Sequence, residues 1–177
     1  LGYAVPGTVI AVGVLIPIAW LDNQIDFLSR IWFDYPTGLL LSGTLGILVF
    51  AYLVRFLSIS LNTVDSGLIS IKPNLDESAR SLGASPSKVL RRIHLPILRT
   101  SLLTALLLVF VEVLKELPTT LILRPFNFNT LAVRTYELAS DERLMDAALP
   151  ALAIVIIGLL PVLLITKSIL KERLKND

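Results

Sequence analysis

Residues 147–166 read AALPALAIVIIGLLPVLLIT and contain no charged side chain. An α-helix rises 1.5 Å per residue, so about 20 apolar residues cross the roughly 30 Å hydrocarbon core of a bilayer. A helix on the surface of a soluble protein instead carries a polar face opposite its apolar face. This run therefore predicts a membrane-spanning helix and an integral membrane protein.

Three further blocks are long enough to cross a bilayer. Residues 3–21 carry no charge, and residues 37–57 carry only Arg55, near enough to the end of the block for its side chain to reach the headgroups. The block 101–122 is interrupted by charges, each of which is costly in lipid. We therefore predict an all-α fold, a polytopic membrane helical bundle forming one domain over residues 1–177, with about four spans at 3–21, 37–57, 101–122 and 147–166.

Composition agrees with this class and argues against others. Apolar residues make up 54% of the chain, above the roughly 45–50% of ordinary globular domains, and the mean hydropathy is +0.76. A net charge of only +2 gives no reason to expect nucleic-acid binding. Without cysteine, and with His94 as the one histidine, we expect no Cys/His metal site, and we interpret His94 as a polar surface contact. No Gly-rich phosphate loop is present, so we predict no catalytic residue and no cofactor in this chain.

Lysine and arginine residues concentrate in alternate connections between the blocks. Six lie in residues 58–100 and four in the tail after residue 166, against four in the connections on the other side. Cytoplasmic loops of membrane proteins carry the excess of Lys and Arg. We therefore predict that residues 58–100 and the C-terminal tail face the cytoplasm.

The long connection 58–100 has the pattern of two short helices. Asn74 is expected to cap the first, with Glu77 reaching back to it, and Leu75, Ala79 and Leu82 lie on one face. Gly83 is expected to end this helix in a left-handed conformation. Ser85 is expected to cap a second helix with Pro86 at its first position, which Leu95-Pro96 then breaks. The product would be a helical hairpin at the inner face of the membrane, although an amphipathic linker lying among the headgroups has the same pattern.

The hairpin also carries a motif. Glu77-Ser78-Ala79, Gly83 six positions after Glu77, and then Ile93, Leu95 and Pro96 resemble the EAA loop of binding-protein-dependent ABC importer permeases, with Ser78 in place of an alanine. The resemblance implies a type I ABC importer permease fold, and it implies that the loop docks on a cytoplasmic ABC ATPase subunit, where ATP is hydrolysed. The residues that it assigns to this coupling are Asp76, Glu77, Ser78, Ala79, Gly83, Ala84, Ser85, Ile93, Leu95 and Pro96.

Two other stretches resemble permeases of the ferric-iron uptake branch. They are Gly2–Thr8, and Glu112–Leu121 running into Arg124-Pro125-Phe126. The resemblance implies a multi-pass subunit in the inner membrane of a prokaryote, with a substrate-binding protein, a second permease half and membrane lipid as partners. Related branches carry polyamines, thiamine, sulfate or molybdate. Family permeases have further spans before the first one here, and with Leu1 as its first residue the chain is expected to be a C-terminal portion.

The charges within the third block permit two interpretations. Glu112, Lys115 and Glu116 are spaced to share one face of a helix, which favours the bundle interior or a water-filled path over lipid. They could line the translocation path, or an internal Glu112–Lys115 salt bridge could fix helix packing. A secondary transporter or channel without an ATPase would also use buried charges. Two groups of small residues are expected to permit close approach of helices and not to bind a ligand: Gly7 with Ala11, and Gly43 and Gly46 with Ser42.

Overall fold

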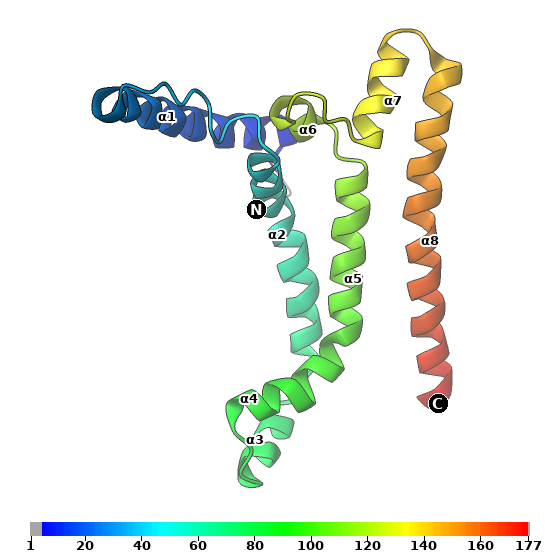
Figure 1. Cartoon of the computed structure of the whole chain (residues 1–177). Helices are drawn as coiled ribbons and strands as arrows, with labels where there is room; N and C mark the ends of the chain where they lie inside the picture. The colour runs from blue at the N-terminus through cyan, green and yellow to red at the C-terminus, as the bar shows by residue number, and fades with distance from the viewer. Residues whose placement is uncertain (1–4, 177) are drawn as a thin grey trace. The chain divides into compact units, whose positions relative to one another are not determined.

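The computed structural model describes residues 5–176, and these form helices and turns without a β-strand. The predicted all-α fold is thereby confirmed. Figure 1 shows the order of the helices along the chain. Their bounds are α1 Gly7–Phe33, α2 Leu45–Ile69, α3 Pro73–Ser81, α4 Pro86–Val89, a π-helical turn Leu90–His94, α5 Leu95–Leu114, α6 Pro118–Leu123, α7 Leu131–Ser140 and α8 Leu144–Asn176.

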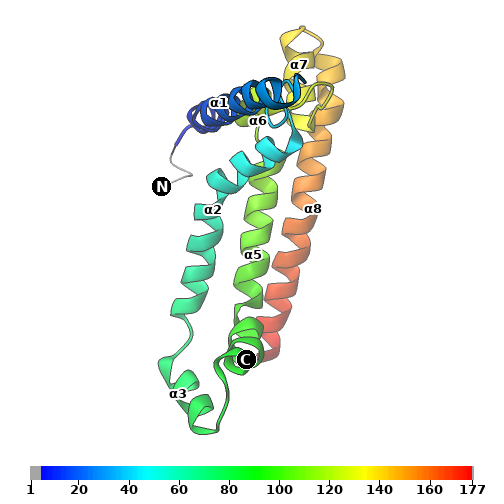
Figure 2. The same cartoon turned by 60° about the vertical axis from the view of Figure 1, so that its left-hand side comes forward.

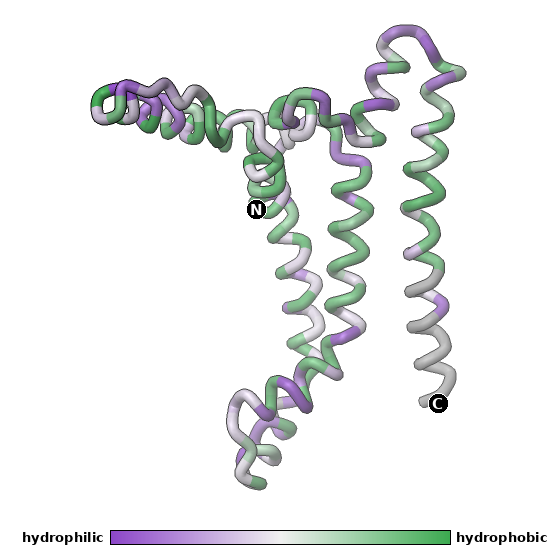
Figure 3. The backbone as a smooth tube through the Cα atoms, in the orientation of Figure 1, coloured by the Kyte–Doolittle hydropathy of each residue, from purple (hydrophilic) through white to green (hydrophobic). Residues whose placement is uncertain are grey.

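Among the described residues, four helical segments are long and apolar enough to cross a membrane. They are Gly7–Phe33, Leu45–Ile69, Pro86–Leu114 and Leu144–Leu163. Figure 3 shows apolar residues predominating in α2, α5 and α8, whereas the α3–α4 region is more hydrophilic. The expected number of apolar helices is therefore present.

The described residues divide into two compact units. The first contains the chain up to Ser58 together with Glu112–Gly158, and the second contains Ile59–Val111 together with the chain from Leu159 onward. In the first unit, an apolar core joins α1, the first half of α2 and α6, and Figures 1 and 2 show α6 beside α1. The buried residues of this core are Ile10, Ala11, Val14, Ile47, Leu48, Ala51 and Leu123.

Helix α1 continues well past residue 21, where the sequence predicted the first apolar block to end. Asp22 is fully buried, and its carboxylate accepts hydrogen bonds from the backbone N–H groups of Leu40, Leu41 and Ser42 at 2.7–3.2 Å. One turn later, Asp26 accepts from the N–H of Gly38 at 2.9 Å. These carboxylates stabilise the extra turns of α1 because they bind the connection that leads back to α2.

The expected continuous helix over residues 101–122 is wrong. Helix α5 ends at Leu114, and α6 begins at Pro118. Proline has no N–H to donate and favours the first turn of a helix, so Pro118 starts a new helix and does not extend the old one. Residues 115–117 between the two helices are therefore not helical.

Candidate functional site

Helix α3, the first of the hairpin, begins earlier than the sequence pattern indicates. Its N-cap position is Lys72 and its first residue is Pro73, without a side-chain capping bond. The predicted capping of Asn74 by Glu77 is therefore wrong, because Pro73 has already set the helical backbone. The carbonyl of Asn74 instead accepts a hydrogen bond from Ser78 Oγ at 2.7 Å, so the Ser78 hydroxyl is satisfied within the helix.

The turn between α3 and α4 confirms the predicted role of Gly83. Gly83 has φ +75°, a left-handed conformation that glycine adopts without steric cost. Its N–H donates to the carbonyl of Arg80 at 2.9 Å, and the N–H of Ala84 donates to that of Ala79 at 3.0 Å. This pair of bonds is the Schellman arrangement, which ends a helix and fixes the direction in which the chain leaves it.

The second helix of the hairpin does not break where expected. Ser85 occupies the N-cap position and Pro86 the first position, as predicted, although the Ser85 hydroxyl contacts Ser87 Oγ at 3.3 Å and caps no backbone group. At Leu95-Pro96 the helix continues into α5 through the π-helical turn, in which the N–H of Leu95 donates to the carbonyl of Leu90. A wider turn relieves the clash between a proline ring and the carbonyl four residues earlier, so residues 86–114 form one helical segment.

Contacts between the two arms hold the hairpin in shape. His94 Nε2 lies 2.7 Å from Asp76 Oδ1, and the side chains of both residues are partly exposed. Ala79 and Val89 are buried at 9% and 5% exposure. His94 thus makes a polar contact, in agreement with the interpretation from sequence, and its partner Asp76 is a residue of the predicted coupling set.

Most residues of the predicted coupling set face solvent. Ala79 is buried, and Asp76, Ala84 and Ile93 are partly buried. The predicted apolar face is mainly uncovered, since Leu82 is 88% exposed and Leu75 is 41% exposed. The exposed members of the set are Glu77, Ser78, Gly83, Ser85, Leu95 and Pro96.

Gly67, at the base of the hairpin, was not identified from the sequence. It is buried near the end of α2, and a Cβ there would overlap the side chain of Ser101 and touch that of Leu98 on α5. A glycine within an apolar helix is the signal that could have found it. By contrast, no close approach of another helix is observed at Gly43 or Gly46 within the described chain. A Cβ at Gly43 meets nothing within 4 Å, and one at Gly46 meets only Thr44 Oγ1 of the same segment, at 3.5 Å.

The three charges of the third block do not share one helix face, so that prediction is wrong. Lys115 Nζ pairs with Glu112 Oε1 at 2.9 Å, and the Lys115 side chain is 57% exposed. Glu116 lies beyond the end of α5, in the non-helical residues before Pro118. Its backbone has left the helix, and its side chain therefore belongs to a different environment.

Glu116 instead forms a buried polar cluster with Arg55. Its residue exposure is 5%, and Oε1 lies 3.3 Å from Arg55 Nη1. The same oxygen accepts from the N–H of Thr119 at 3.1 Å and from its hydroxyl at 2.7 Å. The carboxylate thus compensates a cation and satisfies an N–H in the first turn of α6.

The prediction that Arg55 reaches toward the headgroups is wrong, because its side chain is only 15% exposed and lies against Glu116. Gly7 explains how the charges fit: a Cβ there would overlap Arg55 Nη1 and lie within 3 Å of both Thr119 Oγ1 and Glu116 Oε1. The expected close approach at Gly7 is therefore present. The sequence signal for this pair was that Arg55 is the one charge within the apolar block 37–57 and that Glu116 lies within the apolar block 101–122.

Comparison with known proteins identifies the family. The family model described as "Binding-protein-dependent transport system inner membrane component" matches residues 1–173. The Fe(3+)-transport system permease protein FbpB 2 of Haemophilus influenzae is 28% identical over 169 residues, which are 96% of this chain and 30% of that protein. The putative 2-aminoethylphosphonate transport system permease protein PhnV of Salmonella typhimurium is 32% identical over 134 residues, 76% of this chain and 50% of that protein.

The chain thus spans half or less of the length of these relatives. The family match covers nearly every residue and includes all four apolar helices as well as the hairpin. The chain therefore belongs to the family of inner membrane components of binding-protein-dependent transport systems.

Proposed function

We propose that this chain forms part of the translocation path of an ATP-driven importer and that its α3–α4 hairpin docks on a separate ABC ATPase subunit. Membership of the binding-protein-dependent transport family supports the proposal. The spacing from Glu77 to Pro96, which resembles the EAA loop, supports the docking role. A substrate-binding protein and a second permease half would complete the transporter.

The single observation that carries this proposal is an internally braced hairpin with uncovered apolar side chains. Leu82 and Leu75 are exposed beside Glu77, whereas Ala79 and Val89 are buried. Exposed apolar side chains on an otherwise hydrophilic segment are typical of a protein contact site. A hairpin that merely linked two spans would not need the bracing of the Schellman turn and the His94–Asp76 contact.

The hairpin is also suited to transmit motion. Its second arm continues without interruption from Pro86 to Leu114, an apolar segment long enough to cross a membrane. A rigid helix that moves at one end moves at the other. A displacement of the docked hairpin would therefore shift α5 within the bilayer, which is what coupling of ATP hydrolysis to transport requires.

We propose ferric iron as the substrate, because the ferric relative matches 96% of this chain. The alternative is 2-aminoethylphosphonate, since the relative described as its permease is more similar, at 32% identity, over a shorter stretch. Two measurements separate the candidates. The first is the ligand that the cognate binding protein retains on purification. The second is whether excess iron(III) or excess 2-aminoethylphosphonate competes with the transporter's uptake of that labelled ligand. Uptake that proceeds unchanged in vanadate would instead indicate a transporter without an ATPase.

The docking proposal is tested with Gly83→Val and Glu77→Lys in the complete transporter. Valine at a φ of +75° costs about 1–2 kcal/mol and redirects α4, while lysine reverses the charge of the exposed acid. Both variants should insert in the membrane but lose the co-purifying ATPase or its stimulation by loaded binding protein. The matched control is Gly43→Val, which places valine at a φ of +73° outside the hairpin. If both hairpin variants keep full stimulated hydrolysis, the proposal is wrong.

A further inference from the structure

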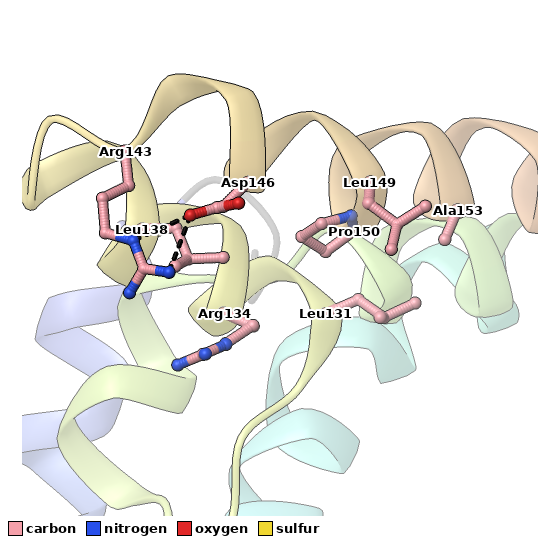
Figure 4. A pocket seen from close by; sticks show the side chains of 8 residues that line it. All are labelled: Leu131, Arg134, Leu138, Arg143, Asp146, Leu149, Pro150 and Ala153. Atoms are coloured by element: carbon pink, nitrogen blue, oxygen red, sulfur yellow. Dashed lines mark hydrogen bonds and ion pairs between the residues drawn. The ribbon is translucent and has the colours of Figure 1, made fainter.

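A pocket between α7 and the start of α8 is not used by the proposed coupling mechanism. Its volume is about 490 Å³, and it lies within the first compact unit. Figure 4 shows Arg134 and Arg143 toward one side of the pocket and Leu149, Pro150 and Ala153 along α8 toward the other. The pocket therefore combines a cationic end with an apolar wall.

The cationic end is only partly neutralised. Arg143 binds Asp146 at 2.7 Å, and both side chains are more than half exposed. The carboxylate nearest to Arg134 is that of Glu137, at 3.7 Å, which is longer than a hydrogen bond. Glu137 already accepts from Arg124 at 3.0 Å and from Asn129 at 2.9 Å. Arg134, at 53% exposure, therefore offers its guanidinium to an anion.

The apolar wall belongs to a helix that is suited to lie in a bilayer. Residues 144–163 have a mean hydropathy of 2.3 in their most apolar window. Leu149 and Ala153 lie five and nine residues into α8, about 8–14 Å along its axis at 1.5 Å per residue. Leu149, which lines the pocket, is 77% exposed, so this wall is open to the side.

We propose that this pocket binds one anionic phospholipid, with its phosphate at Arg134 and Arg143 and an acyl chain along Leu149 and Ala153. Guanidinium groups bind phosphate oxygens through charge-assisted hydrogen bonds, and an acyl chain matches an apolar wall at membrane depth. The cationic groups lie on α7 and just before the first residue of α8, and the apolar wall follows along α8, which is the order of headgroup and tail in a lipid leaflet.

An acidic side chain of a soluble partner is the competing occupant. Such a partner would approach the turn between α7 and α8 end-on, and this turn carries the exposed acids Asp141 and Glu142. Like charges would repel it before it reached Arg134. An acidic side chain would also leave the apolar wall of Leu149, Pro150 and Ala153 uncovered, whereas an acyl chain covers it, so the apolar wall favours the lipid.

The test uses the complete transporter in membranes of phosphatidylcholine with a minor fraction of phosphatidylglycerol. After detergent extraction, the lipids that co-purify are quantified. The wild-type transporter should retain phosphatidylglycerol in preference to phosphatidylcholine. Arg134→Gln should reduce this retention about fivefold, the effect of about 1 kcal/mol for one basic residue near an anionic lipid. The matched control is Arg30→Gln. Arg30 lies on α1, away from the pocket, is similarly exposed at 60%, and pairs with Asp26 of the same helix.

A second variant leaves the charges unchanged. Ala153→Trp should fill the apolar wall and also lower the retention of phosphatidylglycerol. Equal retention by wild type and Arg134→Gln would overturn the proposal. Displacement of the lipid by glycerol 1-phosphate in solution would show a site for soluble phosphate instead. If Arg134→Gln weakens the affinity of the transporter for its substrate-binding protein in membranes of pure phosphatidylcholine, the pocket is a protein contact and the lipid assignment is wrong.

Discussion

Replacement of Glu116 by glutamine tests whether the buried cluster is held together by charge. The glutamine side chain retains an oxygen that can accept from Thr119, but it no longer compensates Arg55. Glu116 is 5% exposed and the Arg55 side chain 15%, so water has little access to the cation that remains. Removing one partner of a buried ion pair costs about 3–5 kcal/mol, mainly because the other charge is left unpaired.

This cost should appear in thermal stability. For a domain of this size, about 1 kcal/mol corresponds to about 2–4 °C in the unfolding midpoint, so Glu116→Gln should lower the midpoint by about 6–20 °C. The assay is thermal unfolding of the purified transporter in detergent, followed by size-exclusion chromatography with fluorescence detection. Membrane insertion is checked separately, so that loss of assembly is distinguished from loss of expression.

Two companion variants make the argument falsifiable. Glu112→Gln removes the same charge from a pair whose Lys115 is 57% exposed, and an exposed pair is worth less than about 1 kcal/mol. Arg55→Met with Glu116→Gln removes both buried charges and should recover most of the lost stability. Equal shifts for Glu112→Gln and Glu116→Gln, or a double variant less stable than Glu116→Gln alone, would refute the reasoning.

The remaining predictions concern packing, the connection after α1 and topology. Gly67→Val should cost about 1–3 kcal/mol in thermal unfolding because it overpacks α2 against α5, whereas Gly13→Val, where a Cβ meets nothing within 4 Å, should be nearly neutral. Asp22→Ala should increase proteolytic cleavage within residues 34–44, because three backbone N–H groups lose their acceptor; cleavage at the wild-type rate would refute this. A cysteine at Ser140 should react with an impermeant reagent from outside, whereas one at Ser87 should react only after permeabilisation, and labelling of Ser87 in intact cells would reverse the orientation.

The hairpin illustrates how far local rules reach. Gly83 and Pro86 could be assigned from sequence because a left-handed turn and the first position of a helix are properties of a few adjacent residues. The start of α3 was predicted wrongly because Pro73 and Asn74 both favour the beginning of a helix, and local rules do not decide which of the two begins it. The continuation through Leu95-Pro96 was also mistaken, since a π-helical turn that accommodates the proline leaves no clear mark in the sequence.

The candidate site in the first unit was less accessible from sequence. Glu116 was identified as an unusual intramembrane charge, but it was expected to share one helix face with Glu112 and Lys115, and no partner was predicted for it. Its partner is Arg55, 61 positions earlier, and the pairing depends on the end of α5 at Leu114 and on the space at Gly7. Hydropathy counts charges along the chain and carries no information about which of them meet.

The sequence by itself determined the all-α membrane class and the number of apolar helices, because spanning length and hydropathy are sums over neighbouring residues. Only the tertiary structure decided that Asp22 binds the connection to α2, that Arg55 is compensated by Glu116, and that Arg134 and Arg143 share a pocket. These contacts join residues far apart in the chain or on separate helices. Their free energy depends on distance and on access of water, and both quantities are defined only once the helices have packed.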